Sequence, residues 1–332
     1  KMDSLEAIKD EIKKLQKSEE QHILEISIVY DERHLKQNEN KELTLIDKKN
    51  LVESSSFSKE DEISKWLKQL HSLVGLNNIK AIIEKLVIYL EYVNRTKDIQ
   101  NLENPNLNTV FKGNPGTGKT TVARILARLL YYLGYVEKDK FAEVSAQDLI
   151  AGYVGQTAIK TRKLLDDNNG GVIFIDEAYI MCNQSDSYAG EALVEILKEM
   201  EKRNTILIFA GYQKEMTNFI NMNPGLLSRI GLSVDFEDYC LDELYQIFIE
   251  KLKRHNLVLH EDAVEIVRKI IDCQRVQKRF GNGRYIMNLF DKIIMNHALN
   301  CKGSDDIEIL KTITVDDLYG VEDKAKEKII GF

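Results

Sequence analysis

The sequence contains few of the residues that usually punctuate a chain. Proline occurs only three times in 332 residues, as Pro105, Pro115 and Pro224, whereas average usage is roughly 5%. This scarcity excludes collagen-like and proline-rich linker classes. None of the 18 glycines precedes Gly75, so residues 1–74 lack both residue types. The places where proline and glycine do occur are therefore candidates for loops of defined shape.

Signs of membrane insertion or secretion are also missing. No stretch approaches the roughly 18 to 20 consecutive apolar residues of a transmembrane helix, and no secretory hydrophobic segment opens the chain. The cysteines lie far apart without a C-x-x-C pair, which predicts buried or inert thiols rather than disulfides or a zinc site. These patterns predict a cytoplasmic protein with no membrane partner. The four cysteines are Cys182, Cys240, Cys273 and Cys301.

An excess of basic charge is absent as well. The chain has 46 Lys and Arg against 53 Asp and Glu, for a formal net charge of −7. Because nucleic-acid binding draws on a basic surface that neutralises phosphates, this balance argues against a nucleic-acid partner. The length predicts two folded domains, or two with an appendage.

The first part of the chain, residues 1–70, is predicted to be a charged N-terminal appendage. It carries 29 charged side chains. A short amphipathic helix is expected after Ser4, and alternating apolar residues predict short strands near 26–29 and 43–45. Ser58 can cap a second helix, whose apolar face we expect to dock on the domain that follows. That face comprises Ile63, Trp66, Leu67 and Leu70.

Two further regions follow. From residue 71 to 239, helical patterns alternate with short apolar strands, which predicts an α/β domain with a mostly parallel sheet covered on both faces. From 240 to 332 the strands nearly stop, and a small α-helical domain is expected. The predicted strands are 109–112, 141–144, 172–175, 206–209 and 232–236. The predicted helices include 79–90, 119–133, 241–255, 261–277 and 284–299, with a mixed tail at 313–318.

Residues 113–120 form a phosphate-binding loop motif. They read Gly-Asn-Pro-Gly-Thr-Gly-Lys-Thr, which satisfies G-x-x-x-x-G-K-[ST] between a predicted strand and a predicted helix. Glycines let backbone N–H groups wrap around phosphate oxygens at the helix start. Lys119 would neutralise the β- and γ-phosphates, and the Thr120 hydroxyl would bind Mg²⁺. The predicted binding residues are Gly113, Asn114, Pro115, Gly116, Thr117, Gly118, Lys119, Thr120 and Thr121.

A second motif lies at the end of the strand at 172–175. This continuous apolar run is typical of a central buried strand, and it is followed by the carboxylates Asp176 and Glu177. Ligands of open α/β sheets bind at the carboxyl ends of strands. We therefore expect Asp176 to bind Mg²⁺ and Glu177 to polarise the attacking water. A solvated helix start after a core strand is the alternative.

Three segments together resemble the AAA+ ATPases of the CbxX/CfqX type, over about residues 70–320. They are G-N-P-G-T-G-K-T-T, V-I-F-I-D-E-A-Y and the A-G-Y at 210–212. The resemblance implies a P-loop NTPase domain followed by a helical lid, ATP and Mg²⁺ as ligands, and assembly of identical chains into a ring, which we expect to be a hexamer.

The resemblance also implies roles for two loops. Residues 148–157 match the family's first pore loop, in which Tyr153 and Val154 would grip an unfolded chain; an aromatic that merely fills the loop is the alternative. Residues 223–230 match the segment whose arginine, here Arg229, would reach the γ-phosphate of the neighbouring subunit. A surface ion-pair arginine is the alternative there, and this segment departs from its relatives at Leu227 and Ile230.

Three further positions follow from the same resemblance. Arg284, in the G-N-G-R at 281–284, would touch the nucleotide from the lid, as the sensor-2 arginine does; helix-start packing is the alternative. Tyr212 occupies the sensor-1 position, where many relatives have Asn. Val74 and Gly75 belong to a segment that would lie against adenine, although a simple joint between helices explains them equally.

The function expected from these features is ATP hydrolysis that drives threading and remodelling of a protein client, with sporulation as one setting. The alternatives are a nucleotide-dependent scaffold without threading, a CbxX-type activator of a carbon-fixing enzyme, a secretion-associated ATPase, and a nucleic-acid motor. The negative net charge disfavours the last of these.

Overall fold

The computed structural model describes residues 59–100, 104–151, 153, 155–182, 189–202, 204–277 and 280–321. Most of the predicted appendage, including the helix after Ser4 and the strands near 26–29 and 43–45, lies outside these residues. The side chains of Asp98 and Gln100 are also outside the description.

A five-stranded parallel sheet forms the centre of the α/β part. Its strands run in the order β2-β3-β4-β1-β5, and every neighbouring pair is parallel. All five predicted strands are confirmed, each to within two residues at either end. The strands are β1 (Thr109–Gly113), β2 (Phe141–Ser145), β3 (Val172–Asp176), β4 (Ile206–Gly211) and β5 (Leu232–Phe236).

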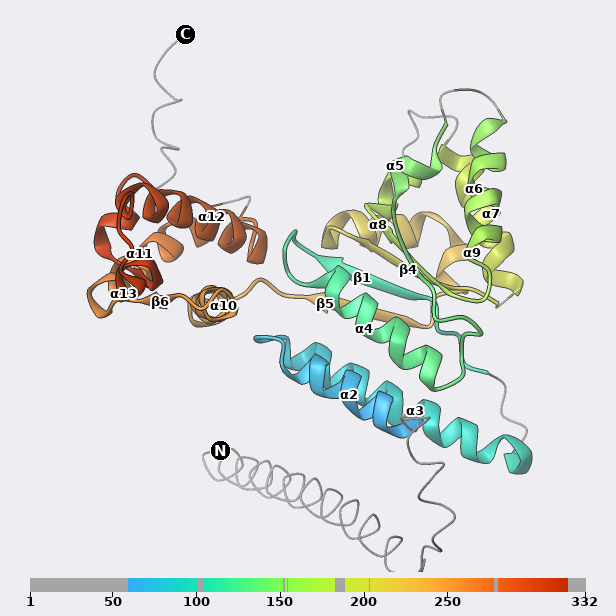
Figure 1. The fold of residues 1–332 in the computed structure, drawn as a ribbon. Helices are drawn as coiled ribbons and strands as arrows, with labels where there is room; N and C mark the ends of the chain where they lie inside the picture. The colour runs from blue at the N-terminus through green and yellow to red at the C-terminus, as the bar shows by residue number, and fades with distance from the viewer. Residues whose placement is uncertain are drawn as a thin grey trace, which may run out of the picture. The chain divides into compact units, whose positions relative to one another are not determined.

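Helices cover both faces of this sheet, as predicted (Figure 1). Side chains alternate along a strand, so in β3 Val172 and Phe174 enter one core whereas Ile173 and Ile175 enter the other. The first core is completed by α2 (Lys59–His71), α3 (Asn77–Gln100) and α4 (Lys119–Tyr132). The second is completed by α5 (Ala146–Leu149), α6 (Gln156–Asp167), η1 (Ala178–Cys182), α7 (Ala189–Lys202), α8 (Gln213–Met222) and α9 (Pro224–Leu227).

Helix α2 docks on the α/β core, as its apolar face predicts. Ile63 and Leu70 are buried in the first core, and Trp66 and Leu67 pack against it. The guanidinium of Arg128 from α4 lies 5.6 Å from the centre of the Trp66 ring. The helix therefore belongs with the domain that follows it.

The C-terminal helices, called the lid below, have a hydrophobic core of their own. They are α10 (Leu241–Arg254), α11 (Glu261–Arg275), α12 (Gly283–Asn300), α13 (Ile307–Lys311) and η2 (Val315–Leu318). Two features were not predicted, the short helix α13 and a parallel pair of two-residue strands, β6 (Val258–Leu259) and β7 (Thr312–Ile313). Such short elements leave no periodic signal in a sequence.

The end of the lid is tied to α12 through buried polar side chains. His297 lies with its Nδ1 2.9 Å from Asp317 Oδ2 and its Nε2 3.1 Å from the carbonyl oxygen of Leu310. Asp317 also accepts a hydrogen bond from Asn300 at 2.7 Å.

None of the described helices combines the length and apolar character needed to cross a membrane. The four cysteines are free; Cys301 is buried, Cys182 is partly buried, and Cys240 and Cys273 are exposed.

Candidate functional site

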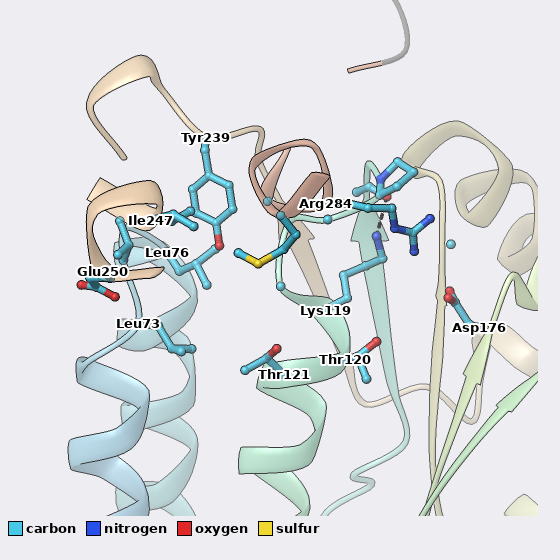
Figure 2. Close-up of a pocket in the computed structure, with 18 of the residues that line it drawn as sticks. Leu73, Leu76, Lys119, Thr120, Thr121, Asp176, Tyr239, Ile247, Glu250 and Arg284 are labelled. Carbon is cyan, nitrogen blue, oxygen red and sulfur yellow. Dashed lines mark hydrogen bonds between the residues drawn. The ribbon is translucent and has the colours of Figure 1, made fainter. Parts of the chain in front are cut away.

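A cavity of about 550 Å³ lies at the carboxyl ends of β1, β3 and β4 (Figure 2). The phosphate loop and the strand ends form one part of its wall. The segment at residues 72–76, Tyr239 after β5, and side chains of α10 and α12 form the rest. The cavity thus lies where parallel α/β sheets bind ligands, and the lid contributes part of it.

The phosphate loop places the start of a helix at this cavity. α4 begins at Lys119, directly after Gly118, which serves as its N-cap in the left-handed conformation at φ 94° and offers no side chain to cap the helix. The first N–H groups of α4 therefore have no side-chain cap and are available to an anionic ligand.

Gly116 is a position where only glycine fits. Its φ is +73°, and a Cβ atom there would lie 2.1 Å from the carbonyl oxygen of Gly281 in the lid. The Gly283 N–H donates a hydrogen bond of 3.0 Å to the Gly116 carbonyl oxygen. The missing side chain is what allows the lid to touch the loop directly.

Lys119 lies in the loop with its ammonium group against the backbone. Its Nζ donates to the carbonyl oxygens of Gly113 at 2.9 Å and of Asn114 at 2.7 Å. Burial lowers the pKa of Lys119, the charges of Asp176 and Asp238 raise it, and the nearby Arg284 lowers it further. These charges surround the place where the phosphates of a nucleotide would bind.

The loop residues predicted to bind nucleotide divide into two groups. Asn114 and Thr117 do not line the cavity. Thr117 is fully buried and donates to the Asn114 carbonyl oxygen at 2.8 Å, so that it braces the loop from within. The loop residues that line the cavity are Gly113, Pro115, Gly116, Gly118, Lys119, Thr120 and Thr121.

Asp176 and Glu177 both line the cavity at the end of β3. Glu177 has a φ of +52°, which is uncommon for a residue with a side chain. Its N–H donates to Asp176 Oδ1 at 2.9 Å. The chain therefore turns sharply at the strand end, and both carboxylates remain at the cavity.

Tyr179 is a neighbour of Glu177 that sequence reasoning missed, although it stands in the D-E-A-Y motif. Its hydroxyl donates to Glu177 Oε1 at 3.5 Å. Burial, followed by the charge of Glu177, raises the pKa of Tyr179 to about 12. Its ring centre lies 6.1 Å from that of Tyr212, which also lines the cavity. One phenol thus contacts the predicted catalytic carboxylate, and a second lies beside the first.

The oxygen ligands at the cavity suit a magnesium ion that binds together with the phosphates of a nucleotide. The Thr120 hydroxyl and the Asp176 carboxylate both line it, and Mg²⁺ typically takes one or two protein oxygens with substrate phosphates and water. Across the described parts of the chain, no group of three or more His, Cys, Asp or Glu side chains is arranged to hold a metal. The residues fit an ion shared with a nucleotide.

At the other end of the cavity, Leu73, Leu76, Ile247 and Tyr239 lie on one side together with Glu250, away from Lys119 and Asp176 (Figure 2). Apolar and aromatic side chains of this kind suit a flat base. Of the two residues predicted to lie against adenine, Val74 lines the cavity and Gly75 does not. The contribution of α10 was not predicted from the sequence.

Arg284 reaches the phosphate end of the cavity from the lid. It is the second residue of α12 and lines the cavity beside Lys119 (Figure 2). The role implied for Arg284, contact with the nucleotide from the lid, stays a prediction.

Arg229 lies outside this cavity. It lines a separate one of about 310 Å³ with Glu201. Its Nη1 donates to the Gly225 carbonyl oxygen at 2.9 Å, and its Nη2 pairs with Glu201 of α7. Asn223 caps the short helix α9, which Pro224 begins. The arginine thus follows a capped helical turn and does not line the cavity that its own chain's phosphate loop forms.

Tyr153 is 72% exposed between α5 and α6. Val154, its predicted companion, lies outside the described residues. The N–H groups of Gly155 and Ala158 donate to the Glu191 carboxylate at 3.3 and 3.4 Å, so α7 supports the segment that follows Tyr153.

Comparisons with known proteins agree with this geometry. Residues 109–237 match the family described as "ATPase family associated with various cellular activities (AAA)", and residues 241–328 match the "AAA lid domain". A solved structure titled "Crystal structure of FIGL-1 AAA domain in complex with ADP" matches with a TM-score of 0.54 and 19% identity, covering 75% of this chain and 82% of that one.

Three relatives match most of the chain. Stage V sporulation protein K of Bacillus subtilis is 35% identical, over 70% of this chain and 74% of that protein. The chloroplastic ribulose bisphosphate carboxylase/oxygenase activase of Cyanidioschyzon merolae is 37% identical, over 72% and 84%. The chromosomal protein CbxX of Cupriavidus necator is 36% identical, over 77% and 84%.

Proposed function

Because the chain belongs to the AAA+ ATPases of the CbxX type, we propose that it hydrolyses ATP with Mg²⁺ in the cytoplasm. In this proposal identical chains assemble into a ring, expected to be a hexamer, that remodels a protein client. The nucleotide domain would comprise residues 71–239 together with α2, which packs on it, and the lid would comprise residues 240–332. The rest of the predicted appendage, residues 1–70, would precede α2.

One observation carries the proposal. A single cavity brings together Lys119 and Thr120 from the start of α4, Asp176 and Glu177 from the end of β3, and Arg284 from the lid. These residues supply what phosphoryl transfer to water requires, namely charge neutralisation, metal ligands, a base and a group that senses the phosphate.

Each side chain has a distinct task in the proposed reaction. Lys119 and the start of α4 bind the β- and γ-phosphates. Thr120 and Asp176 would hold Mg²⁺, which when bound neutralises charge on those phosphates. Glu177 orients the attacking water and accepts its proton. Arg284 contacts the phosphates from the lid, so their presence favours a closed lid.

Arg229 is proposed to complete the site of a neighbouring subunit. Its position outside its own chain's cavity supports that assignment, since an arginine supplied in trans makes hydrolysis depend on assembly. Its present partner, Glu201, holds the guanidinium at the surface until a neighbour's phosphate competes for it.

The client is proposed to be a protein gripped by Tyr153, whose exposure supports that role. Two relatives suggest different settings. The relative named as a ribulose bisphosphate carboxylase/oxygenase activase favours activation of a carbon-fixing enzyme as the second candidate function, and the relative named for sporulation keeps that process as a setting.

The hydrolytic assignment is tested with Glu177→Gln. This variant should bind ATP like the parent, because phosphate binding rests on other residues. Its turnover should fall by roughly 100-fold or more, as when a general base is lost. Glu137→Gln, an exposed carboxylate that does not line the cavity, is the matched control. Turnover of Glu177→Gln near that of the control would rule out the assignment.

A further inference from the structure

Three polar side chains connect the phosphate loop to the lid. Asp238, in the connection between β5 and α10, accepts hydrogen bonds from Asn114 Nδ2 at 2.9 Å (Oδ1) and 2.8 Å (Oδ2). Its Oδ1 also accepts from Asn282 Nδ2 at 2.7 Å. One carboxylate therefore bonds to the loop and to the lid. We call Asn114, Asp238 and Asn282 the hinge clamp.

Asn282 is fully buried and holds an uncommon backbone conformation, with φ 49° and ψ −127°. Its side chain uses both polar atoms. Oδ1 accepts from the N–H of Tyr239 at 3.0 Å, and Nδ2 donates to Asp238 and more weakly to the Pro115 carbonyl oxygen at 3.4 Å. Strained conformations persist where the surroundings determine them from several sides, and here the hinge and the loop do so.

The clamp lies next to the residue that enters the cavity. Asn282 is the N-cap of α12, and Arg284 is the second residue of that helix. Between them, the Gly283 N–H binds the Gly116 carbonyl oxygen at 3.0 Å. Asn114, Asp238 and Asn282 do not line the cavity. Apart from the electrostatic effect of the Asp238 charge, which also acts on Lys119, their effect on a nucleotide must therefore pass through the loop or through Arg284.

We propose that the hinge clamp positions Arg284 at the phosphate end of the cavity, so that Asp238 and Asn282 couple the γ-phosphate to the closed position of the lid. This proposal rests on the proposed function, since it takes the ligand to be ATP. Asp238 and Asn282 are positioning residues, because they act through Arg284 and touch no nucleotide atom.

The test is a double-mutant cycle on nucleotide affinity in the full-length chain. Asp238→Asn places an amide N–H where an oxygen accepts from Asn114 or Asn282. Fluorescent ATP and ADP analogues report the Kd of the parent, Asp238→Asn, Arg284→Ala and the double variant. Asp238→Asn should weaken ATP binding about tenfold, as loss of a charge-assisted hydrogen bond does, and ADP binding less than threefold.

Comparing the losses of ATP affinity in the single and double variants shows whether Asp238 positions Arg284 or only stabilises the fold. If the clamp acts through Arg284, the double variant should bind ATP within twofold of Arg284→Ala alone. The proposal would be overturned if the fold-loss in ATP affinity of the double variant equalled the product of the two single fold-losses, or if Asp238→Asn weakened ATP and ADP binding equally. A parent that bound neither nucleotide would instead defeat the proposed function, so the two failures are distinguishable.

Two further variants keep the result interpretable. Asp238→Ala removes both acceptor oxygens without adding a donor. It provides a second double-mutant cycle if Asp238→Asn unfolds at a lower temperature than the parent. Glu237→Gln is the matched control, since it removes the same charge one residue away, at an exposed carboxylate with no hydrogen bond or ion pair to another described residue. It should leave both affinities within twofold of the parent, and a loss equal to that of Asp238→Asn would contradict the clamp.

Discussion

The contact between Gly116 and the lid yields a prediction whose size follows from the coordinates. In Gly116→Ala, the new Cβ would lie 2.1 Å from the Gly281 carbonyl oxygen and 2.7 Å from the Arg284 nitrogen, both backbone atoms. The lid must therefore retreat by about 1 Å or more before ordinary van der Waals contact is restored. That retreat breaks the hydrogen bond from Gly283 and withdraws Arg284 from the phosphates.

The cost can be estimated from these two lost interactions. A backbone hydrogen bond contributes about 0.5–1.5 kcal/mol and one to a charged group about 1.5–3 kcal/mol. The first loss destabilises the protein with or without ATP, whereas the second weakens ATP binding by about 1.5–3 kcal/mol, so ATP affinity should fall at least about tenfold. Isothermal titration of ATP into the full-length variant measures this loss directly.

Gly303→Ala separates the steric effect from backbone strain. Gly303 has a φ of +84°, close to that of Gly116, but no atom of the described residues lies within 4 Å of a Cβ built there. Both variants should lose about 1–2 kcal/mol of stability from the left-handed conformation, and only Gly116→Ala should lose ATP affinity. Binding by Gly116→Ala within threefold of the parent would refute the reasoning, as would an equal loss in Gly303→Ala.

Two further predictions concern charge and the client. Because burial lowers the pKa of Lys119 below the free value of 10.5, its neutral form appears at lower pH than for an exposed lysine. The ATP affinity of the parent should therefore decline with rising pH, beginning below pH 10.5. The variant Lys119→Arg stays charged and should not show this decline. If the ATP Kd of the parent and of Lys119→Arg had the same pH dependence, binding of phosphate by charged Lys119 would be contradicted. Tyr153→Ala should keep ATP turnover within twofold but lose at least about tenfold of client unfolding, because the ring lies outside the cavity and is 72% exposed. Tyr153→Phe should keep both activities, and Tyr319→Ala, 70% exposed on the lid, is the matched control; client unfolding by Tyr153→Ala equal to that of the control would exclude a gripping role.

The strands and long helices could be predicted because their signals are local. The run at 172–175 is apolar on both faces and is followed by charge, and β3 ends at Asp176, one residue beyond the predicted strand. Strand order was not predictable in this way. β1 lies between β4 and β5, and that placement depends on packing between segments about 100 residues apart, which periodicity does not report.

In the candidate site, too, the residues with a local sequence signal could be predicted and the others could not. The phosphate loop and the carboxylates at the end of β3 form contiguous motifs, and the rule that strand ends meet at one edge brought them together. Tyr239 and Asp238 carry no motif. Tyr239 donates to the Thr117 carbonyl oxygen at 3.3 Å across 122 positions of sequence. Asn114 was predicted to bind nucleotide as part of the loop, and that stays a prediction; the contacts of its side chain with Asp238 were not predicted.

In the proposed ring, the ATPase site is complete only between subunits, with Glu177 from one chain and Arg229 from the next. Glu177→Gln lacks the base but has the arginine, and Arg229→Ala lacks the arginine but has the base. Each should be nearly inactive alone. In an equimolar mixture that assembles at random, about one interface in four pairs an intact Glu177 with an intact Arg229, so ATP turnover should recover to roughly a quarter of the parent rate. A mixture that stays as inactive as the separate variants at every ratio, while mixed assembly is demonstrated, would contradict the account.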